Sequence, residues 1–279
     1  MLRDLVVHLE GDGGDDTRLS YAEQICADFQ AHLTGIFLNI SHIPTSAGYA
    51  GFGAADVLAQ YNSASIKAGD KAMKVLEEHF DQLLSIPHEL RRYDVLLAEA
   101  ASVLCSQVRT SDLLVTTRPY GTADHFPELV EWSIFGSGRG VLLAPPQIRA
   151  KKDGFGTIMV CWRDTKESSR AVSQAMPFLQ RAKKVVIAMV DESGAPEQFG
   201  QEPGADISRH LSRHGCTVEL RHLTGWSSVS EALLNEAEKS GADMIVMGSY
   251  GHSRIRQWVL GGVTRDVMSK SVLPILTAH

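Results

Sequence analysis

The same order of short apolar runs and helical stretches occurs twice along the 279 residues. The first copy opens with LRDLVVHL at 2–9 and the second with FGTIMVCW at 155–162. Four more runs follow in each copy, at 33–40, 88–95, 111–118 and 140–146 in the first and at 184–191, 216–223, 242–249 and 272–279 in the second. Strands that alternate with helices form parallel sheets through right-handed crossovers. The pattern therefore predicts an α/β fold with two parallel sheets, one in each half.

The two copies differ in length near the middle of the first. SDLLV at 111–115 aligns with ADMIV at 242–246 at an offset of 131, whereas the first strands align at an offset of 153. The first half thus carries about 22 additional residues (153 minus 131), which we assign to 41–80. Two prolines and a run of charge interrupt the pattern at 144–154, as domain linkers do. We predict domains at 1–148 and 149–279.

Charge and cysteine usage exclude several classes of protein. The formal net charge is -6 and the Lys and Arg residues are dispersed, so the chain lacks the basic patch of a nucleic-acid-binding protein. The four cysteines form no C-x-x-C pair, which favours reduced, buried thiols. No apolar run has the length of a signal peptide or a membrane span. We expect a cytoplasmic protein with neither nucleic acid nor membrane as a partner.

Four glycines punctuate VMGSYGHSRIRQWVLGGVTRDVM at 246–268. Gly248 follows a buried run and so lies at the carboxyl end of a strand, where open parallel sheets bind ligands. Gly261 and Gly262 precede a stretch with one apolar helical face, and free N–H groups at a helix start bind anions. Two interpretations stay open: the glycines cradle a phosphate, or they only turn the chain. The P-loop and the G-x-G-x-x-G signature after either first strand are absent.

At these residues the chain resembles the universal stress protein family. Nucleotide-binding members of that family carry G-x-x-G, nine residues, then G followed by Ser or Thr, and Gly248, Gly251 and Gly261 match this motif. The stretches SRHLSRHGCTVELRH and SKSVLPIL are also similar to the family's pattern. The resemblance extends over the whole chain. It implies two Rossmann-like domains in tandem, each with a five-stranded parallel sheet and helices on both faces, and ATP at the carboxyl edge of the strands.

The resemblance also implies a set of binding residues in the second half. Phosphate contacts would come from the start of the last helix, and the adenine and ribose would lie against the strand ends. The implied nucleotide-binding residues are Val190, Met247, Gly248, Gly251, Gly261, Gly262, Val263 and Thr264. His252 and Arg254 follow Gly251 and either reach the phosphates or are solvated. Mg²⁺ would accompany ATP.

Two positions depart from the family's pattern. Gly262 stands where the family has Ser or Thr, which removes a hydroxyl but keeps the backbone donor. Arg163 stands where the family has an Asp that contacts the nucleoside. An arginine approaches a phosphate or stacks on a base, but it cannot accept a hydrogen bond as a carboxylate does. These departures put base selectivity in question more than phosphate binding.

The first half has lost the glycines of this motif. At the offset of 131, Thr117 replaces Gly248 and Tyr120 replaces Gly251. Glu10 matches the family's carboxylate position, but Asp12, Asp15 and Asp16 crowd the same loop. That much negative charge would oppose a triphosphate. We therefore predict that the first half is a degenerate copy that supports the fold and the interface.

Taken together, the sequence and the resemblance predict a stress-response regulatory protein that binds ATP or another adenine nucleotide through its C-terminal domain. The alternative is an interaction scaffold that binds no nucleotide. No catalytic signature organises the Ser, His and Asp residues, so we expect no enzyme, or at most weak ATP hydrolysis. The two halves are expected to pair as a pseudo-dimer within one chain, and two chains to form a homodimer. The protein partner that such a regulator would contact is not identified.

Overall fold

The computed structural model of the protein describes residues 1–41, 54–120, 126–147, 154–190, 203–249 and 262–279. The first half contains β1 (Asp4–Leu9), α1 (Asp15–Phe29), β2 (His32–Ser41), α2 (Ala54–Phe80), β3 (His88–Leu96), α3 (Leu97–Val108), β4 (Leu113–Thr117), α4 (Pro127–Gly136) and β5 (Gly140–Ala144). The second contains β6 (Thr157–Cys161), α5 (Lys166–Leu179), β7 (Lys184–Val190), α6 (Ala205–Arg213), β8 (Val218–Leu223), α7 (Val229–Lys239), β9 (Met244–Gly248), α8 (Gly262–Lys270) and β10 (Ile275–Ala278). Every strand predicted from the sequence is present.

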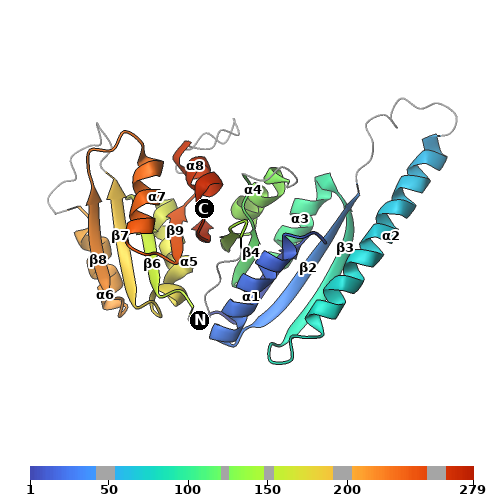
Figure 1. The fold of residues 1–279 in the computed structure, drawn as a ribbon, viewed down its shortest axis with the longest axis horizontal. Coiled ribbons are helices and arrows are strands. Elements are labelled where there is room, and N and C mark those ends of the chain that lie inside the picture. The colour runs from blue at the N-terminus through green and yellow to red at the C-terminus, as the bar shows by residue number, and fades with distance from the viewer. Residues whose placement is uncertain (42–53, 121–125, 148–153, 191–202, 250–261) are drawn as a thin grey trace.

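The strands of each half are parallel and follow the same order. That order is β3-β2-β1-β4-β5 in the first half and β8-β7-β6-β9-β10 in the second. The expectation of two separate sheets was wrong, because β5 and β10 pair antiparallel and join all ten strands, with Leu143 opposite Ile275 and Val141 opposite Thr277. Both strands are wholly buried, and pairing satisfies the backbone groups that an edge strand would leave open. Figure 1 shows the two halves side by side.

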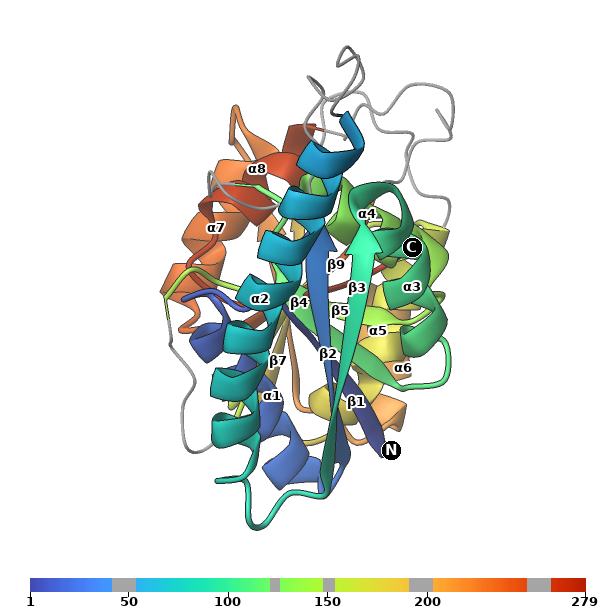
Figure 2. The same ribbon diagram turned by 90° about the vertical axis from the view of Figure 1, so that its right-hand side faces the viewer.

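Helices cover both faces of the sheet, as predicted. Leu5, Val7 and Leu9 of β1 point into one apolar cluster, which includes residues of α1, α2, α5 and α6. Val6 points into the other, which includes residues of α3, α4, α7 and α8. Figure 2 shows α2 and α3 on opposite sides of β2 and β3. Because the inner strands are buried on both faces, they appear in the sequence as continuous apolar runs.

The additional residues of the first half extend α2. This helix has 27 residues, whereas α6, its counterpart, has 9. Leu76 and Phe80 at the end of α2 are buried in the core, and the residues at 42–53 lie outside the described part of the chain. Despite its length, α2 is not apolar enough to cross a membrane, and neither is any other described helix.

Two helices of the second half begin at residues with capping side chains. The Thr165 hydroxyl accepts a hydrogen bond from the Ser168 N–H at the start of α5, and the Ser228 hydroxyl accepts one from the Glu231 N–H at the start of α7. These bonds satisfy N–H groups that the first turn of a helix leaves without partners. They fix where each helix begins relative to the strand before it.

Candidate functional site

The carboxyl ends of β6 and β9 form the topological switch point of the second half. The two strands are neighbours, but the chain leaves β6 toward α5 on one face and leaves β9 toward α8 on the other. Open parallel sheets bind ligands at the carboxyl ends of strands where the connections diverge in this way. The ends of β6 and β9 are therefore where the fold favours a ligand.

Several of the residues predicted to bind nucleotide lie at this edge. Val190 is the last residue of β7, Gly248 is the last residue of β9, and Gly262 is the first residue of α8. Met247 is buried, and Arg163 is exposed just after β6. Val263 packs against the apolar core, and Thr264 is half-buried one residue further along α8. The remaining predicted residues lie outside the described part of the chain: Gly251, His252, Arg254 and Gly261.

Gly248 has a packing role that the motif did not indicate. A Cβ at this position would lie 2.6 Å from the carbonyl carbon of Glu167 and 2.6 Å from the backbone nitrogen of Ser168. The first turn of α5 thus lies directly against the end of β9. Only glycine permits this approach without displacement of the helix.

The first turn of α5 carries charges of both signs. Lys166 is largely exposed, and its Nζ lies 3.4 Å from the carboxylate of Glu167, whose side chain is buried. Burial opposes ionisation of Glu167, but its backbone N–H and Lys166 outweigh that effect and lower its pKa. The N-terminus of α5 thus already holds a carboxylate. An incoming phosphate would meet less competition at the start of α8.

Hydroxyl groups tie the end of β9 to β10, and this network was missed from the sequence. The hydroxyls of Ser249 and Thr277 are hydrogen-bonded to each other, and Thr277 also donates to the Met247 carbonyl over 2.9 Å. His279 Nδ1 lies 3.1 Å from the Ser249 carbonyl oxygen. The partners are separated by 28 to 30 residues in the chain, so no local pattern could have indicated these contacts.

In the first half, a buried arginine lies at the loop after β1, the loop that corresponds in the repeat to the one after β6. Arg18 is 1% exposed and forms ion pairs of 2.6 Å with Glu10, 2.7 Å with Asp12 and 2.6 Å with Asp15. The Asp15 carboxylate also accepts hydrogen bonds from the backbone N–H groups of Glu10 and Gly11, over 3.1 and 2.7 Å. The loop after β1 therefore has an internal carboxylate where a phosphate binder would offer free N–H groups.

This arrangement changes the reason for expecting that the first half binds no nucleotide. In the sequence, that expectation rested on the repulsion of a triphosphate by Glu10, Asp12, Asp15 and Asp16. Arg18 offsets part of that charge, and the backbone donors are already used. Sequence reasoning missed Arg18 because a lone arginine in a helix ordinarily indicates a solvated face.

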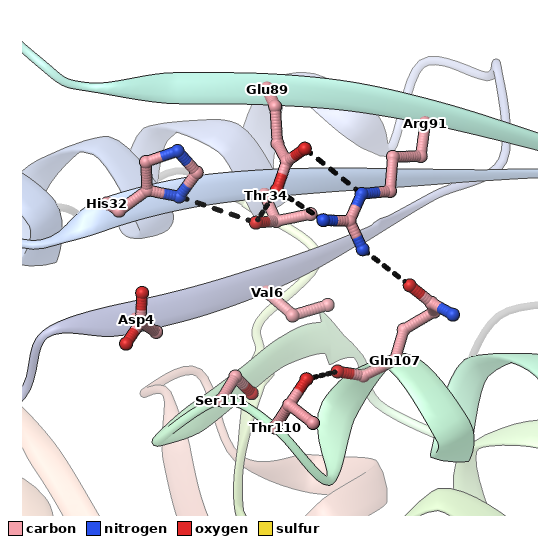
Figure 3. Close-up of a pocket in the computed structure, with 9 residues that line it drawn as sticks. All are labelled: Asp4, Val6, His32, Thr34, Glu89, Arg91, Gln107, Thr110 and Ser111. Carbon is pink, nitrogen blue, oxygen red and sulfur yellow. Dashed lines mark hydrogen bonds and ion pairs between the residues drawn. The ribbon is translucent and has the colours of Figure 1, made fainter.

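Two surface hollows on the described part of the first half lie away from the switch points. A hollow of about 670 Å³ lies between α1 and the segment at 79–86. Another, of about 240 Å³, lies near the starts of β1 and β2. Figure 3 shows Arg91 beside this hollow, held by Glu89 at 2.5 Å and by Gln107 at 2.7 Å. These polar groups satisfy one another at the edge opposite to the one where parallel sheets bind ligands.

The four cysteines are free thiols; Cys26, Cys105 and Cys216 are buried, and Cys161 is half-buried. Burial raises the pKa of Cys26, beside Glu23, and of Cys161 to about 12. At pH 8 we expect iodoacetamide to modify these two thiols on the order of a thousandfold more slowly in the native protein than in denaturant, because the thiolate is the nucleophile. Mass spectrometry of timed samples measures both rates. Equal rates for Cys161 in the two conditions would contradict this assignment.

Comparison with protein families and curated proteins finds similarity to universal stress proteins over parts of the chain. Residues 154–279 match the model of the universal stress protein family. Universal stress protein Slr1230 of Synechocystis sp. is 37% identical over 67 residues, which is 24% of this chain and 23% of that protein. Universal stress protein MJ0577 of Methanocaldococcus jannaschii is 41% identical over 46 residues, which is 16% of this chain and 28% of that protein. The matches thus span less than a third of either curated relative.

Solved structures share the fold of both halves. A universal stress protein from Archaeoglobus fulgidus DSM 4304 superposes with a TM-score of 0.70 at 17% identity, over 99% of this chain and 95% of that one. A putative universal stress protein from Pseudomonas aeruginosa UCBPP-PA14 has a TM-score of 0.56 at 15% identity, over 99% of this chain and 93% of that one. The tandem arrangement of two α/β halves therefore occurs in other proteins as well.

Proposed function

We propose that the protein is a stress-response regulator that binds ATP or another adenine nucleotide through its second half. The observation that carries the proposal is the open start of α8 beside the switch point of β6 and β9. A Cβ added at Gly262 would meet no atom of the described residues within 4 Å, so the described part of the chain leaves room for a ligand at the first turn of α8. The N–H groups and partial positive charge of a helix start suit a phosphate, and residues 154–279 match the model of the universal stress protein family, whose nucleotide-binding motif the glycines resemble.

The proposed contacts follow from the placement of the described residues. Gly262 and Thr264 supply a backbone donor and a hydroxyl to the phosphates, and Val190 and Met247 lie at the strand ends for the adenine. Arg163 and Lys166 are exposed after β6 and add positive charge, which favours a triphosphate. Mg²⁺ would be held by the phosphates. Gly251, Gly261, His252 and Arg254 complete the proposed site from outside the described residues.

We further propose that residues 1–148 are a second domain of the same family that has lost the site. The Arg18 cluster supports this proposal, because it fills the loop after β1 with the protein's own ion pairs. Domain 149–279 then contains the one working site. The β5–β10 pairing makes the two domains a pseudo-dimer within the chain, and a homodimer of two chains remains part of the proposal.

Titration with a fluorescent ATP analogue in the presence of Mg²⁺ tests the proposal. We expect saturable binding, and we expect Gly262→Ser to tighten it on the order of tenfold, since a hydroxyl donating to a charged phosphate is worth about 1.5 kcal/mol. Among the described residues, nothing lies close enough to Gly262 to obstruct the serine side chain. Gly13→Ser is the matched control, since a Cβ at this exposed glycine of the first half would likewise meet no described atom within 4 Å. The absence of saturable binding by the unsubstituted protein would refute the nucleotide proposal.

One observation favours a second candidate function, an interaction scaffold without nucleotide. The close approach of α5 accounts for Gly248 without any ligand, so this motif glycine has a purely structural reason to be present. On this alternative, neither the unsubstituted protein nor Gly262→Ser binds the analogue, and ATP raises the thermal stability of neither. The same titration therefore separates the two candidates.

A further inference from the structure

Residues of the first half contact α8 near both of its ends. Arg118 Nη1 donates a hydrogen bond over 3.1 Å to the carbonyl of Ser271, the residue that follows α8. At the other end, the Arg265 guanidinium lies over the Tyr120 ring, 5.1 Å from its centroid. Arg118 and Tyr120 belong to the short segment after β4, and Figure 1 shows α8 at the junction with the first half.

Tyr120 is itself held in place by α4. Its hydroxyl is hydrogen-bonded to Glu131, and both side chains are half-buried. Burial raises the pKa of Glu131, while the charge of Arg265 opposes that rise. Glu131, Tyr120 and Arg265 therefore form one cluster across the two halves, and a cation over an aromatic ring stabilises its geometry.

The positions of Arg118 and Tyr120 in the repeat explain why this segment can reach α8. At the offset of 131, Arg118 corresponds to Ser249 (118 plus 131) and Tyr120 to Gly251 (120 plus 131). The first half thus has a long cation and an aromatic ring where the second half has the small residues of its glycine motif. Side chains as long as those of Arg118 and Tyr120 span the junction to α8 and Ser271.

From these contacts we infer that Arg118 and Tyr120 are positioning residues for the nucleotide site of the second half. Arg118 and Tyr120 stand where the second half has two residues of its glycine motif segment, and their contacts fix the orientation of α8. We call these two residues the clamp. The first turn of α8 would bind the phosphates. The inference rests on the proposed function for its effect on nucleotide. The contacts between the halves do not depend on the proposed function, and they can be tested without nucleotide.

Hydrogen–deuterium exchange of the full chain without nucleotide tests the clamp. We expect Arg118→Ala and Tyr120→Ala each to accelerate exchange of the amides at 266–270 by about threefold or more, because each removes a contact that restrains α8. Tyr120→Phe keeps the ring beneath Arg265 and is expected to keep most of the protection. Arg109→Ala is the matched control, since Arg109 donates to the Gly136 carbonyl at the end of α4 within the first half. Exchange in α8 that does not exceed that of Arg109→Ala would overturn the clamp.

A second measurement tests the link to the nucleotide. Tyr120→Ala is expected to weaken binding of the fluorescent ATP analogue by about two- to fivefold, as a less restrained α8 spends less time in the binding orientation. Unchanged affinity together with faster exchange would overturn the positioning role. If the unsubstituted protein binds no nucleotide, the proposed function fails, and the exchange measurement alone decides whether the first half restrains α8.

Discussion

Replacement of Arg18 by alanine is expected to lower the free energy of unfolding by about 3–5 kcal/mol at neutral pH, the usual cost of leaving a buried charge unpaired. Arg18 is 1% exposed, and the side chains of two of its partners, Asp15 and Glu10, are 5% and 12% exposed. Without the guanidinium, these carboxylates face each other in a site that water hardly reaches. Urea unfolding followed by circular dichroism measures the loss.

A matched variant isolates the effect of burial. Arg209 pairs with Asp206 over 2.7 Å at the same i,i+3 spacing as Arg18 and Asp15, but both side chains of that pair are exposed. We expect Arg209→Ala to cost about 0.2–1 kcal/mol. Equal losses for the two alanine variants would contradict the structural role assigned to Arg18.

The loss of unfolding free energy caused by Arg18→Ala is expected to depend on pH and to be smaller in acid. Burial is the largest influence on Asp15 and raises its pKa, whereas Arg18 opposes that rise. Removal of Arg18 raises the folded-state pKa further, so the variant gains stability, relative to the unfolded chain, as the carboxylate becomes protonated. The difference between the two proteins is expected to be largest at a pH above the folded-state pKa of Asp15 in the variant, and to shrink as pH falls through that pKa. A difference that grows toward acid would contradict this explanation.

Replacement of Gly248 by alanine is expected to cost about 1–3 kcal/mol, because the new Cβ would overlap the backbone of α5. The overlap involves the Glu167 carbonyl carbon and the Ser168 nitrogen, which belong to the helix and cannot rotate away as a side-chain end would. Displacement of α5 would also alter the region at the carboxyl end of β6, where the nucleotide is proposed to bind. Nucleotide affinity is therefore expected to fall together with stability, measured by thermal unfolding and by titration.

Gly262→Ala provides the contrast. A Cβ at Gly262 meets no atom of the described residues within 4 Å, and a helical position favours alanine over glycine, so stability should stay equal or rise by up to about 1 kcal/mol. Equal destabilisation by the two alanine substitutions would show that the approach of α5 to Gly248 is not as close as described. Stability lost at Gly262 alone would reverse the assignment of the two glycines.

The strands could be predicted because a strand that is buried on both faces appears in the sequence as a continuous apolar run. Runs such as Met244–Met247 are apolar without alternation, since both faces of an inner strand pack against helices. The repeat at offsets of 131 and 153 then placed the extra residues of the first half in the segment that contains α2. The joining of the sheets through β5 and β10 was missed, because an apolar edge strand does not specify which strand will cover it.

The candidate site was predictable only where a motif carried it. The sequence placed Gly248 at the end of a strand and Gly262 at the start of a helix, which is where β9 ends and α8 begins. The packing of α5 on Gly248 depends on a helix 80 residues earlier in the chain (248 minus 168), so the sequence did not indicate it. Arg18 was missed for a similar reason. Its partner Glu10 precedes it by eight residues, and only the turn of the loop after β1 brings the two together.

Calorimetric titration of the full chain with ATP and Mg²⁺ tests the central claim most directly, because it counts sites as well as detecting them. We propose that the second half holds the working site, and Arg18 and Asp15 fill the corresponding loop of the first half. We therefore predict saturation at one nucleotide per chain. Saturation at two nucleotides per chain would contradict the degenerate first half. The absence of binding heat at several temperatures, with no displacement of the fluorescent analogue, would contradict the nucleotide site itself.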